Sequence, residues 1–553
     1  MSNFLNTGVT GLLAFQRALA TTSHNIANAN TPGFSRQQAV LAARVGLGSA
    51  SLTGQGTEIQ TVRRVYDQYL VGQVHVNTAA YSRLESFHSL STQVDNLLAD
   101  GGNGVGVMLQ EFFNSIDAMA DDPASLVTRE ALLGQARALT DRFGQADSRL
   151  NALDRDVNNR LQNSVSEINA IAESIAQLNR QIVTSSSGGQ LPNDLLDRRD
   201  ALLTELNQHV NVTSISQGDG SLNVFIGNGL VLVRSGSAEA LATEQNEFEP
   251  GRLDVRLANG PNITSRLSGG AIGGALDFRR EVLDPARNGL GRMATALATS
   301  LNQQHRAGMT LQGQLGGDLF AIGAPLAQAS AANSGAASVT VSVSDVGALT
   351  THDYRLSFDG GAWQLRHADS GQPVAMTGSG TGADPFVADG VEIVISGGAA
   401  AAGDDYLLRP TAGAAAGLEL LVENPADLAA AAAVIATSEL GNTGNAEVSA
   451  GVVIDSTDPN LLTPQTITFI DPSNYTIGGA GPFAYTSGDD IDFNGWRVTI
   501  SGSPEAGDIF NIAPNTSGNA DNRNALLISE IQSIGVLDAG SSSLSDGFGR
   551  LTA

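Results

Sequence analysis

A long apolar stripe between residues 143 and 182 constrains the fold of this chain more than any other feature. Its members recur mostly at intervals of three and four, which places them on one face of an α-helix. The stripe consists of Phe143, Ala146, Leu150, Leu153, Val157, Leu161, Val165, Ile168, Ala172, Ile175 and Ile182. It predicts a long helix or a helical hairpin, within a helical region that runs from about residue 76 to residue 206.

The first 27 residues carry a second, narrower stripe. Apolar residues recur every seven positions and partly fill the alternate position of the heptad, which is half of a coiled-coil seam. The predicted self-assembly seam consists of Leu5, Val9, Leu12, Phe15, Leu19 and Ile26. Because a single amphipathic helix of this length is marginal in water, it needs a partner helix. The alternative is an ordinary surface helix on a globular core.

The stretch "HNIANANTPGFSRQ", residues 24–37, predicts the end of this first helix. Asparagine tolerates the left-handed conformation found at helix ends, and Pro32 disfavours helix in the residue before it. We therefore expect the helix to stop near Asn28 to Asn30, and Gly33 to let the backbone turn into extended chain.

A shorter helix is predicted for "LPNDLLDRRDALLTELNQHV", residues 191–210. Asn193 can cap its start, and Asp194 with Arg198 has the spacing of an i,i+4 ion pair. These two charges are interpreted as a solvated face and not as a site. Beyond it, "GSLNVFIGNGLVLVRSG" predicts a β-hairpin that turns at residues 227–229.

The second half of the chain changes to short strands and contains an internal repeat. Residues 389–410, "DGVEIVISGGAAAAGDDYLLRP", match residues 494–514, "NGWRVTISGSPEAGDIFNIAP". Two related β modules are the economical account. Between them, "ENPADLAAAAAVIATSEL" predicts a short connecting helix, with Asn424 as its cap and Pro425 at its first position.

These elements predict an elongated α+β multidomain protein, with a long-helix or coiled-coil body built from both chain ends and inserted all-β modules. The predicted divisions are an N-terminal helix with its Asn-rich exit at 1–32, a helical body with a β-hairpin element at 33–335 completed by 515–553, a first β module at 336–422, the connecting helix at 423–441 and a second β module at 442–514.

Composition excludes several functions. The formal net charge of −26 opposes binding to nucleic acid. All thirty basic residues are arginine and cysteine is absent, so lysine and thiol chemistry are excluded. No two of the seven histidines lie within one helical turn, which excludes helical HExxH zinc sites. We predict no catalytic, cofactor or metal site, no enzymatic activity, and no signal peptide or membrane span.

The helix exit is similar to the N-terminal signature of the bacterial flagellar axial proteins, the rod, hook and hook-associated family. The resemblance rests on Asn25, Ile26, Asn28, Thr31, Gly33 and Phe34. The helix after residue 192 resembles the hook-associated members found at the hook–filament junction, through Asn193, Asp194, Leu195, Leu196, Asp197, Arg199 and Asp200. The stretches "ADNRNALLISEIQS", "VYDQYL" and "VDNLLAD" add to this likeness.

The resemblance implies a structural component of the flagellum, needed for motility, that polymerises between hook and filament. It implies self-association, contact with the hook protein and with a second hook–filament junction protein, and extracellular localisation after export by the flagellar secretion apparatus. Family members continue past the position of Leu551 into heptad-patterned helices, so the helix expected to bind the export chaperone lies outside this chain. The alternatives are a hook or distal-rod protein, or a secreted adhesin or hydrolase carried on the β modules.

Overall fold

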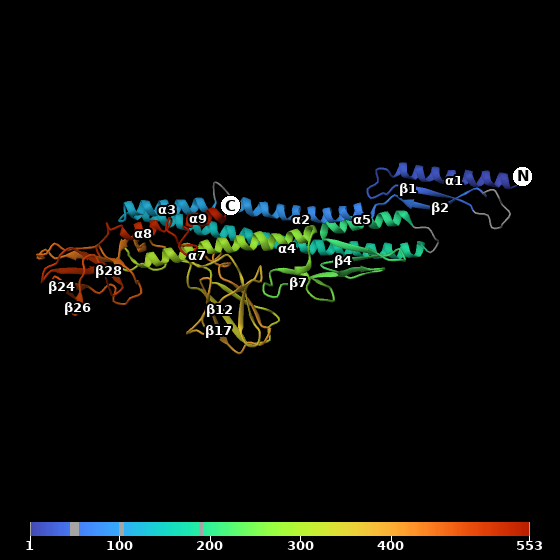
Figure 1. Cartoon of the computed structure of the whole chain (residues 1–553). Helices are drawn as coiled ribbons and strands as arrows, with labels where there is room; N and C mark the ends of the chain where they lie inside the picture. Colours follow the sequence, from blue (N-terminus) through green and yellow to red (C-terminus); the bar gives the residue numbers. More distant parts are fainter. Residues whose placement is uncertain (1, 45–54, 99–103, 187–191, 552–553) are drawn as a thin grey trace. The chain divides into compact units, whose positions relative to one another are not determined.

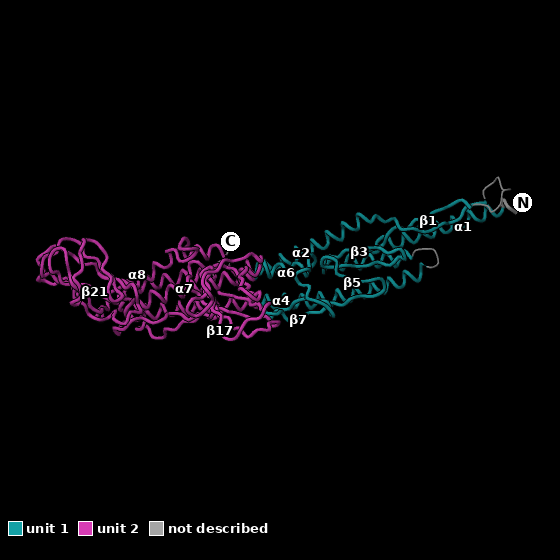
Figure 2. Tube along the Cα trace, turned by 60° about the horizontal axis from the view of Figure 1, so that its bottom comes forward, with its two compact units in different colours: residues 1–93, 152–283 teal, residues 94–151, 284–553 magenta. Residues whose placement is uncertain are grey.

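The computed structural model describes residues 2–44, 55–98, 104–186 and 192–551. The chain divides into two compact units, one made of Met1–Gln93 and Ala152–Leu283, the other of Val94–Asn151 and Asp284–Ala553 (Figure 2). The helices α2 (Gln68–Leu98) and α4 (Leu126–Ser186) each contribute residues to both units. Each unit is therefore built from two separate stretches of the sequence, as expected for an α+β protein whose body uses distant segments.

The apolar stripe lies on one continuous helix. α4 has 61 residues, and every member of the stripe is buried. The long-helix alternative is therefore correct and the helical hairpin is not. The apolar face of this helix is not exposed, because other elements of each unit cover the stripe.

The remaining secondary structure of the first unit consists of helices and small antiparallel sheets (Figure 1). The helices are α1 (Ser2–Ala27), α5 (Asn193–His209), α6 (Gly270–Phe278), the 3-10 turn η1 (Thr264–Arg266) and the π-helical turn η2 (Arg279–Leu283). The strands are β1 (Gln37–Ala43), β2 (Thr57–Arg64), β3 (Val212–Ser216), β4 (Leu222–Ile226), β5 (Leu230–Arg234), β6 (Ser237–Ala238), β7 (Leu241–Gln245) and β8 (Leu253–Leu257).

The hairpin predicted around residues 227–229 is confirmed as β4–β5, within a sheet of order β3-β4-β5-β6. The β1–β2 hairpin was not predicted. It follows directly after the exit of α1, and its register pairs Gln37 with Arg64. Both strands pack against α1.

In the second unit, the end of the chain returns to the helical body. The helices here are α3 (Val105–Asp121), α7 (Asp284–Arg306), α8 (Arg523–Glu530) and α9 (Leu544–Leu551). α8 packs against α3 and α7, and α9 packs against α7. Asn522 donates a hydrogen bond to the Ala120 carbonyl (2.8 Å) and Gln532 donates one to Gln110 (2.8 Å). The predicted body from both chain ends is thus confirmed.

The first β module, defined here as residues 326–409, has two antiparallel sheets around one core. Their orders are β11-β18-β13-β14-β15 and β12-β17-β16. The strands are β11 (Leu326–Ala329), β12 (Ala337–Val343), β13 (Tyr354–Phe358), β14 (Trp363–His367), β15 (Pro373–Val374), β16 (Phe386–Ala388), β17 (Val391–Gly397) and β18 (Asp405–Arg409).

The second β module, defined here as residues 434–514, repeats this topology. Its five-stranded sheet has the order β21-β29-β24-β25-β26, and β22, β23 and β27 pair with β28. The strands are β21 (Val434–Ser438), β22 (Glu447–Val448), β23 (Val452–Val453), β24 (Gln465–Asp471), β25 (Asn474–Ile477), β26 (Ala480–Ala484), β27 (Asp490–Phe493), β28 (Trp496–Ser501) and β29 (Ile509–Pro514).

A hydrogen-bonded lock closes the first module. The buried Asp404 carboxylate accepts hydrogen bonds from three backbone N–H groups at 2.8 to 3.1 Å. Asn333 exchanges two hydrogen bonds with the backbone of Asp405 (2.9 and 2.8 Å). A Cβ on Gly335 would lie 2.1 Å from Asp404 Oδ2, so this position requires glycine. We call this arrangement the Asn-Gly-Asp lock.

The second module contains the same lock. Asp508 is buried and accepts hydrogen bonds from three backbone N–H groups at 2.8 to 3.3 Å. Asn442 exchanges two hydrogen bonds with the backbone of Ile509 (2.9 and 2.7 Å). A Cβ on Gly444 would lie 2.4 Å from Asp508 Oδ2. The repeat therefore extends beyond the two segments that the sequence comparison aligned.

The predicted connecting helix at 423–441 is wrong. Asn424 does cap a turn, but this is the 3-10 turn η3 (Pro425–Asp427), and the alanine run after it is extended. β20 (Ala431–Ala432) pairs with β9 (Gly308–Met309), and β21 pairs with β29. Burial of this run between other segments outweighs the helix preference of alanine. A further short pair joins β10 (Phe320–Ala321) to β19 (Glu419–Leu420).

Candidate assembly surface and signature junction

The two sides of α1 differ sharply in residue size. The side that faces the β1–β2 hairpin carries small residues, among them Thr10, Gly11 and the buried Ala14. Small side chains let the helix lie close to the two strands. The opposite side carries the large apolar residues of the predicted seam, so the hairpin covers the back of the helix and leaves its seam open.

Every residue of the predicted α1 seam is exposed. The exposed fractions lie between 50% and 72% for Leu5, Val9, Leu12, Phe15, Leu19 and Ile26. Leu13, 56% exposed, lies beside them and was not predicted. An exposed row of large apolar side chains on one helix marks an interaction surface, because single scattered apolar residues are ordinary but a contiguous row is not. We call these seven residues the α1 seam.

The Asn-rich exit is held by side-chain hydrogen bonds. α1 ends at Ala27, one residue before the predicted stop, and Asn28 donates to the His24 carbonyl (3.0 Å). The Thr31 hydroxyl donates to Asn28 Oδ1 (3.3 Å), and the Thr31 N–H donates to the Asn28 carbonyl (2.9 Å). Asn28 and Thr31 of the signature thus build the turn that ends the helix.

A second asparagine joins the helix to the chain after the turn. Asn25 donates to the Gln37 carbonyl (2.8 Å) and accepts from the Gln37 N–H (2.8 Å), which closes the loop between them. The ring of Phe34 meets the ring of His24 edge to face, with centroids 5.4 Å apart. Gly33 has φ +77°, and a Cβ there would lie 3.2 Å from Ala201 Cβ of α5. The signature residues therefore set the direction in which the chain leaves α1.

The signature lies against the start of α5. The Ser35 N–H donates to Asp197 Oδ2 (3.1 Å), and Gln37 Nε2 donates to Asp194 Oδ1 (3.0 Å). Arg64, at the end of β2, donates from Nη1 to Asp197 Oδ1 (2.8 Å) and to Asp200 Oδ2 (2.7 Å). Two motifs that were recognised separately in the sequence thus form one structure. We call it the signature junction, made of residues 24–37, Arg64 and residues 193–200.

Charge pairing dominates the centre of the signature junction. The side chains of Arg64 and Asp197 are 11% and 9% exposed. Burial by itself would lower the pKa of Arg64, but hydrogen bonds and charge from Asp197 and Asp200 outweigh it, and the pKa is raised. Arg64 also lies over the ring of Tyr66, 4.8 Å from its centroid. Two charge-assisted hydrogen bonds from one guanidinium nitrogen to two carboxylates of α5 therefore hold the hairpin and the helix together.

The structure corrects one sequence-based interpretation of α5. Asn193 is not a cap, because Pro192 precedes the helix and the Asn193 amide donates to the Val62 carbonyl (2.9 Å). Asp194 and Arg198 are exposed, as predicted, and Asp194 also contacts Gln37 and His24 across the junction. Asp197 and Asp200, on another side of the helix, contact Arg64.

The other residues of this helix secure its inner side. Leu196 is buried and Leu195 is half-buried. Arg199 is buried and donates to Asn179 Oδ1 (3.0 Å) and to the Gly220 carbonyl (2.8 Å). Burial lowers the pKa of Arg199. This arginine therefore ties α5 to α4 and to the turn before β4.

The N-terminal segment places the chain in a class of proteins. Residues 5–34, which hold the α1 seam and most of the signature, match the family model described as "Flagella basal body rod protein". This is the class of flagellar axial proteins, in which the sequence resemblance had placed the chain. Residues 91–320 match "Flagellar hook-associated protein FlgK helical domain", and residues 328–410 match "Flagellar hook-associated protein 1, D2-like domain".

Relatives and a solved structure agree with these matches. Flagellar hook-associated protein 1 of Escherichia coli K12 is 34% identical over 500 residues, 88% of this chain and 87% of the relative. The protein of the same name from Salmonella typhimurium LT2 is 35% identical over 443 residues, 78% of this chain and 79% of the relative. The flagellar hook junction protein FlgK from Burkholderia pseudomallei superposes with a TM-score of 0.78 at 28% identity, over 87% of this chain and 94% of that one.

The chain belongs to the flagellar hook-associated protein 1 (FlgK) family, whose members are structural components of the bacterial flagellum at the hook–filament junction. This outcome removes the hook or distal-rod alternative. Within the described ranges, no helix combines the length and the apolar character that crossing a bilayer requires.

Proposed function

We propose that this chain polymerises at the hook–filament junction through the α1 seam, with the signature junction holding that seam in place. The observation that supports this proposal is a row of large apolar side chains exposed on one side of α1, while the β1–β2 hairpin covers the other side. A protein of this kind joins two polymers by shape and packing and not by chemistry.

The size of the exposed surface supports this function. Full burial of one large apolar side chain contributes about 1.5–3 kcal/mol, so the seven residues of the α1 seam offer on the order of 10 kcal/mol before the costs of association. A gain of this size offsets much of the cost of helix pairing between copies. The proposed neighbours are further copies of the chain, the hook protein and a second hook–filament junction protein.

The proposal also includes location and the absence of catalysis. We infer that the chain is exported by the flagellar secretion apparatus, with a dedicated chaperone, and acts outside the cell. An open groove of about 870 Å³ beside α4 is lined by polar residues that include Asp141, Asp147 and Glu419. Burial raises the pKa of Asp147. The proposed absence of catalysis rests on membership in a family of structural flagellar proteins.

The test replaces Leu12 and Leu19 together by aspartate, in a strain whose own gene for this chain carries the change. We expect loss of motility, with filament protein released as monomer into the medium. Because both side chains are already exposed, the purified variant should keep its helix content and thermal midpoint.

Arg17→Asp is the matched control, because Arg17 is exposed on the same helix but lies off the seam. Its motility should stay near that of the wild type. Normal swimming with the double aspartate variant, or equal defects in both variants, would sink the proposed role of the seam.

A further inference from the structure

Two histidines and an aspartate come together on one face of the first β module. His352 lies just before β13, His367 ends β14, and Asp369 lies in the tight turn between β14 and β15. In the sequence they are up to 17 positions apart, so helical spacing rules do not detect them. Strand pairing is what joins them.

The register explains their meeting. Tyr354 pairs with His367 in the β13–β14 ladder, and the Ala368 N–H donates to the Asp353 carbonyl (2.8 Å), which continues the pairing toward the turn. His352 therefore lies opposite Asp369. Because side chains alternate between the two faces of a sheet, both pairs point to the same face.

The geometry suits a metal ion. One possible ligand atom from each of His352, His367 and Asp369 lies within 4.8 Å of the other two. His352 Nδ1 is 3.2 Å from Asp369 Oδ2, and the two imidazole rings have centroids 4.1 Å apart. Zinc bonds of about 2.1 Å in a tetrahedron need ligand atoms about 3.4 Å apart. Small side-chain rotations close that difference.

A second carboxylate lies beside the two imidazoles. Asp389 Oδ2 lies 4.0 Å from His367 Nε2 and accepts a hydrogen bond from the Tyr354 hydroxyl (2.9 Å). A small rotation of the His367 ring would bring this carboxylate within hydrogen-bond distance, where it would orient a ligating histidine from outside the ligand set.

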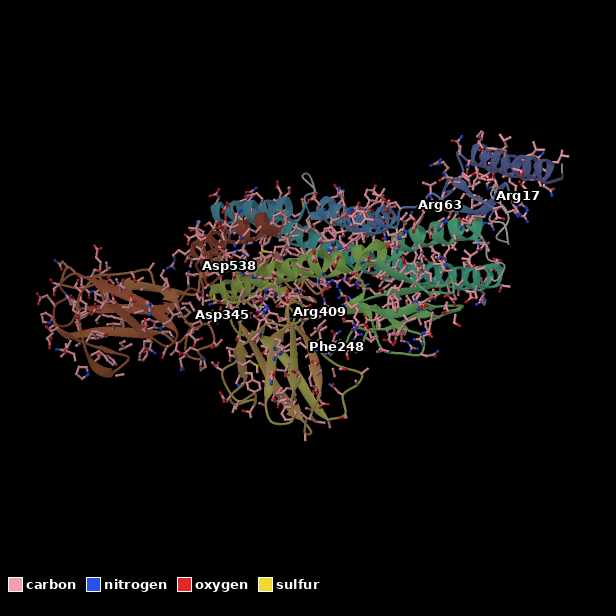
Figure 3. All side chains as sticks on the ribbon, turned by 45° about the vertical axis from the view of Figure 1, so that its right-hand side comes forward. Arg17, Arg63, Phe248, Asp345, Arg409 and Asp538 are labelled. Carbon is pink, nitrogen blue, oxygen red and sulfur yellow. The ribbon has the colours of Figure 1, made fainter. Side chains whose placement is uncertain are left out.

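The backbone under the cluster is anchored to the helical body. Asp353 accepts hydrogen bonds from Asn288 of α7 (2.9 Å) and from Arg409 (3.2 Å), and Figure 3 shows Arg409 at the end of the module that adjoins α7. The second module lacks this cluster, because its repeat register places Thr463 at the position of His352. The cluster is therefore a property of the first module and not of the shared β fold.

We propose that His352, His367 and Asp369 form a binding site for a divalent transition metal of the zinc class, with Asp389 as a positioning residue. Two imidazoles and one carboxylate are a donor set that suits zinc, and three protein ligands leave a coordination position open for water or a neighbouring group. The bound ion would fasten the ends of β13 and β14 to the following turn, beside α7. This site is independent of the α1 seam.

The test titrates the metal-free full chain with Co²⁺, whose visible absorption reports a site with nitrogen and oxygen ligands, followed by displacement with Zn²⁺. We expect one equivalent to bind, and His352→Asn and His367→Asn each to weaken binding at least tenfold. Asp389→Asn should weaken it less, and the second module has Asn494 at the same left-handed position, so the backbone accepts this change.

His88→Asn is the control, because His88 is an exposed histidine on α2. Thermal midpoints of the metal-free variants should match the wild type, which separates lost ligands from lost fold. Absence of saturable binding at micromolar metal overturns the proposal. Binding that survives both histidine variants, or that disappears with His88→Asn, places the ion elsewhere and also overturns it.

Discussion

Arg64 organises the signature junction although its partners lie 133 and 136 positions away in the chain. The sequence shows four acidic residues in α5, Asp194, Asp197, Asp200 and Glu205, but no reason to pair two of them with an arginine at the end of a strand. Charged residues on a short helix are usually solvated. The β1–β2 hairpin, which brings Arg64 next to α5, was not predicted from the sequence.

Replacing Arg64 by methionine should loosen the signature junction. The change keeps the apolar stem but leaves the carboxylates of Asp197 and Asp200 without their cation, at a cost of about 2–3 kcal/mol. Hydrogen exchange measured by mass spectrometry should show protection in residues 193–200 and in β1 reduced by roughly 30- to 100-fold.

Arg63→Met provides the comparison, because Arg63 is the exposed neighbour on the other face of β2 (Figure 3). Its exchange pattern should differ from the wild type by less than about 0.5 kcal/mol. Equal loss of protection in both variants would mean that the Arg64 pairs do not hold the junction.

Among the elements, regular periodicity was predictable and alanine-rich extended chain was not. The stripe of α4, the β4–β5 hairpin and the repeated strands β17–β18 and β28–β29 all follow their sequence patterns. The prediction of a helix after Pro425 is wrong because alanine fits a helix and a crowded strand equally well. Pairing with the neighbouring strands β9 and β29 decides between the two conformations. The locks had a usable signal, since "NSG" and "NTG" precede the two Gly-Asp pairs.

Each lock should stabilise its own module. Asp508→Ala removes an acceptor for three backbone N–H groups and should destabilise the second module by about 2–3 kcal/mol. Hydrogen bonding outweighs burial and lowers the pKa of Asp508. The lock's contribution is therefore present above the unfolded pKa of about 4 and is lost as the pH falls below it.

The two tryptophans make this prediction measurable, because Trp363 lies in the first module and Trp496 in the second. In a Trp363→Phe background, urea unfolding followed by Trp496 fluorescence should shift with Asp508→Ala and not with Asp404→Ala. In a Trp496→Phe background, the unfolding transition followed by Trp363 fluorescence should shift with Asp404→Ala and not with Asp508→Ala. Shifts of both signals by either variant would contradict independent locks.

At the scale of the whole molecule, the α+β class, the body from both chain ends and the two related modules were predictable, while the division into interleaved units was not. Periodicity and repeats are local signals, whereas unit boundaries inside α2 and α4 arise from long-range packing. Each module also begins and ends on neighbouring antiparallel strands, since Leu326 pairs with Arg409 and Val434 with Pro514. The chain therefore enters and leaves each β module at adjacent points.

Excision of the second module should leave the helical body folded. Joining Val434 to Pro514 by a short glycine-serine linker removes the contact of Arg523 with the Ala450 carbonyl and the packing of module residues on the buried cluster of Met309, Ala431 and Ala433. Hydrogen exchange in α3 and α8 should stay within about threefold of the wild type.

The matched excision joins Leu326 to Arg409 and should be more damaging. It removes Asp353, which contacts Asn288 of α7, and the Gly347 carbonyl, which accepts from the Ala539 N–H (2.7 Å). Protection in α7 and α9 should fall. If the first excision unfolds the body, or if both have the same effect, the modules are not separable in this way.

The hairpin behind α1 has a consequence for symmetry. A helix bare on all sides could meet its neighbours at any rotation about its own axis, and such an array would have no unique lattice. Because the β1–β2 hairpin covers one side of α1, only the opposite side is open for contact with a neighbour. In the proposed assembly, the handedness and pitch of the polymer would then be set within each subunit, before any neighbour binds.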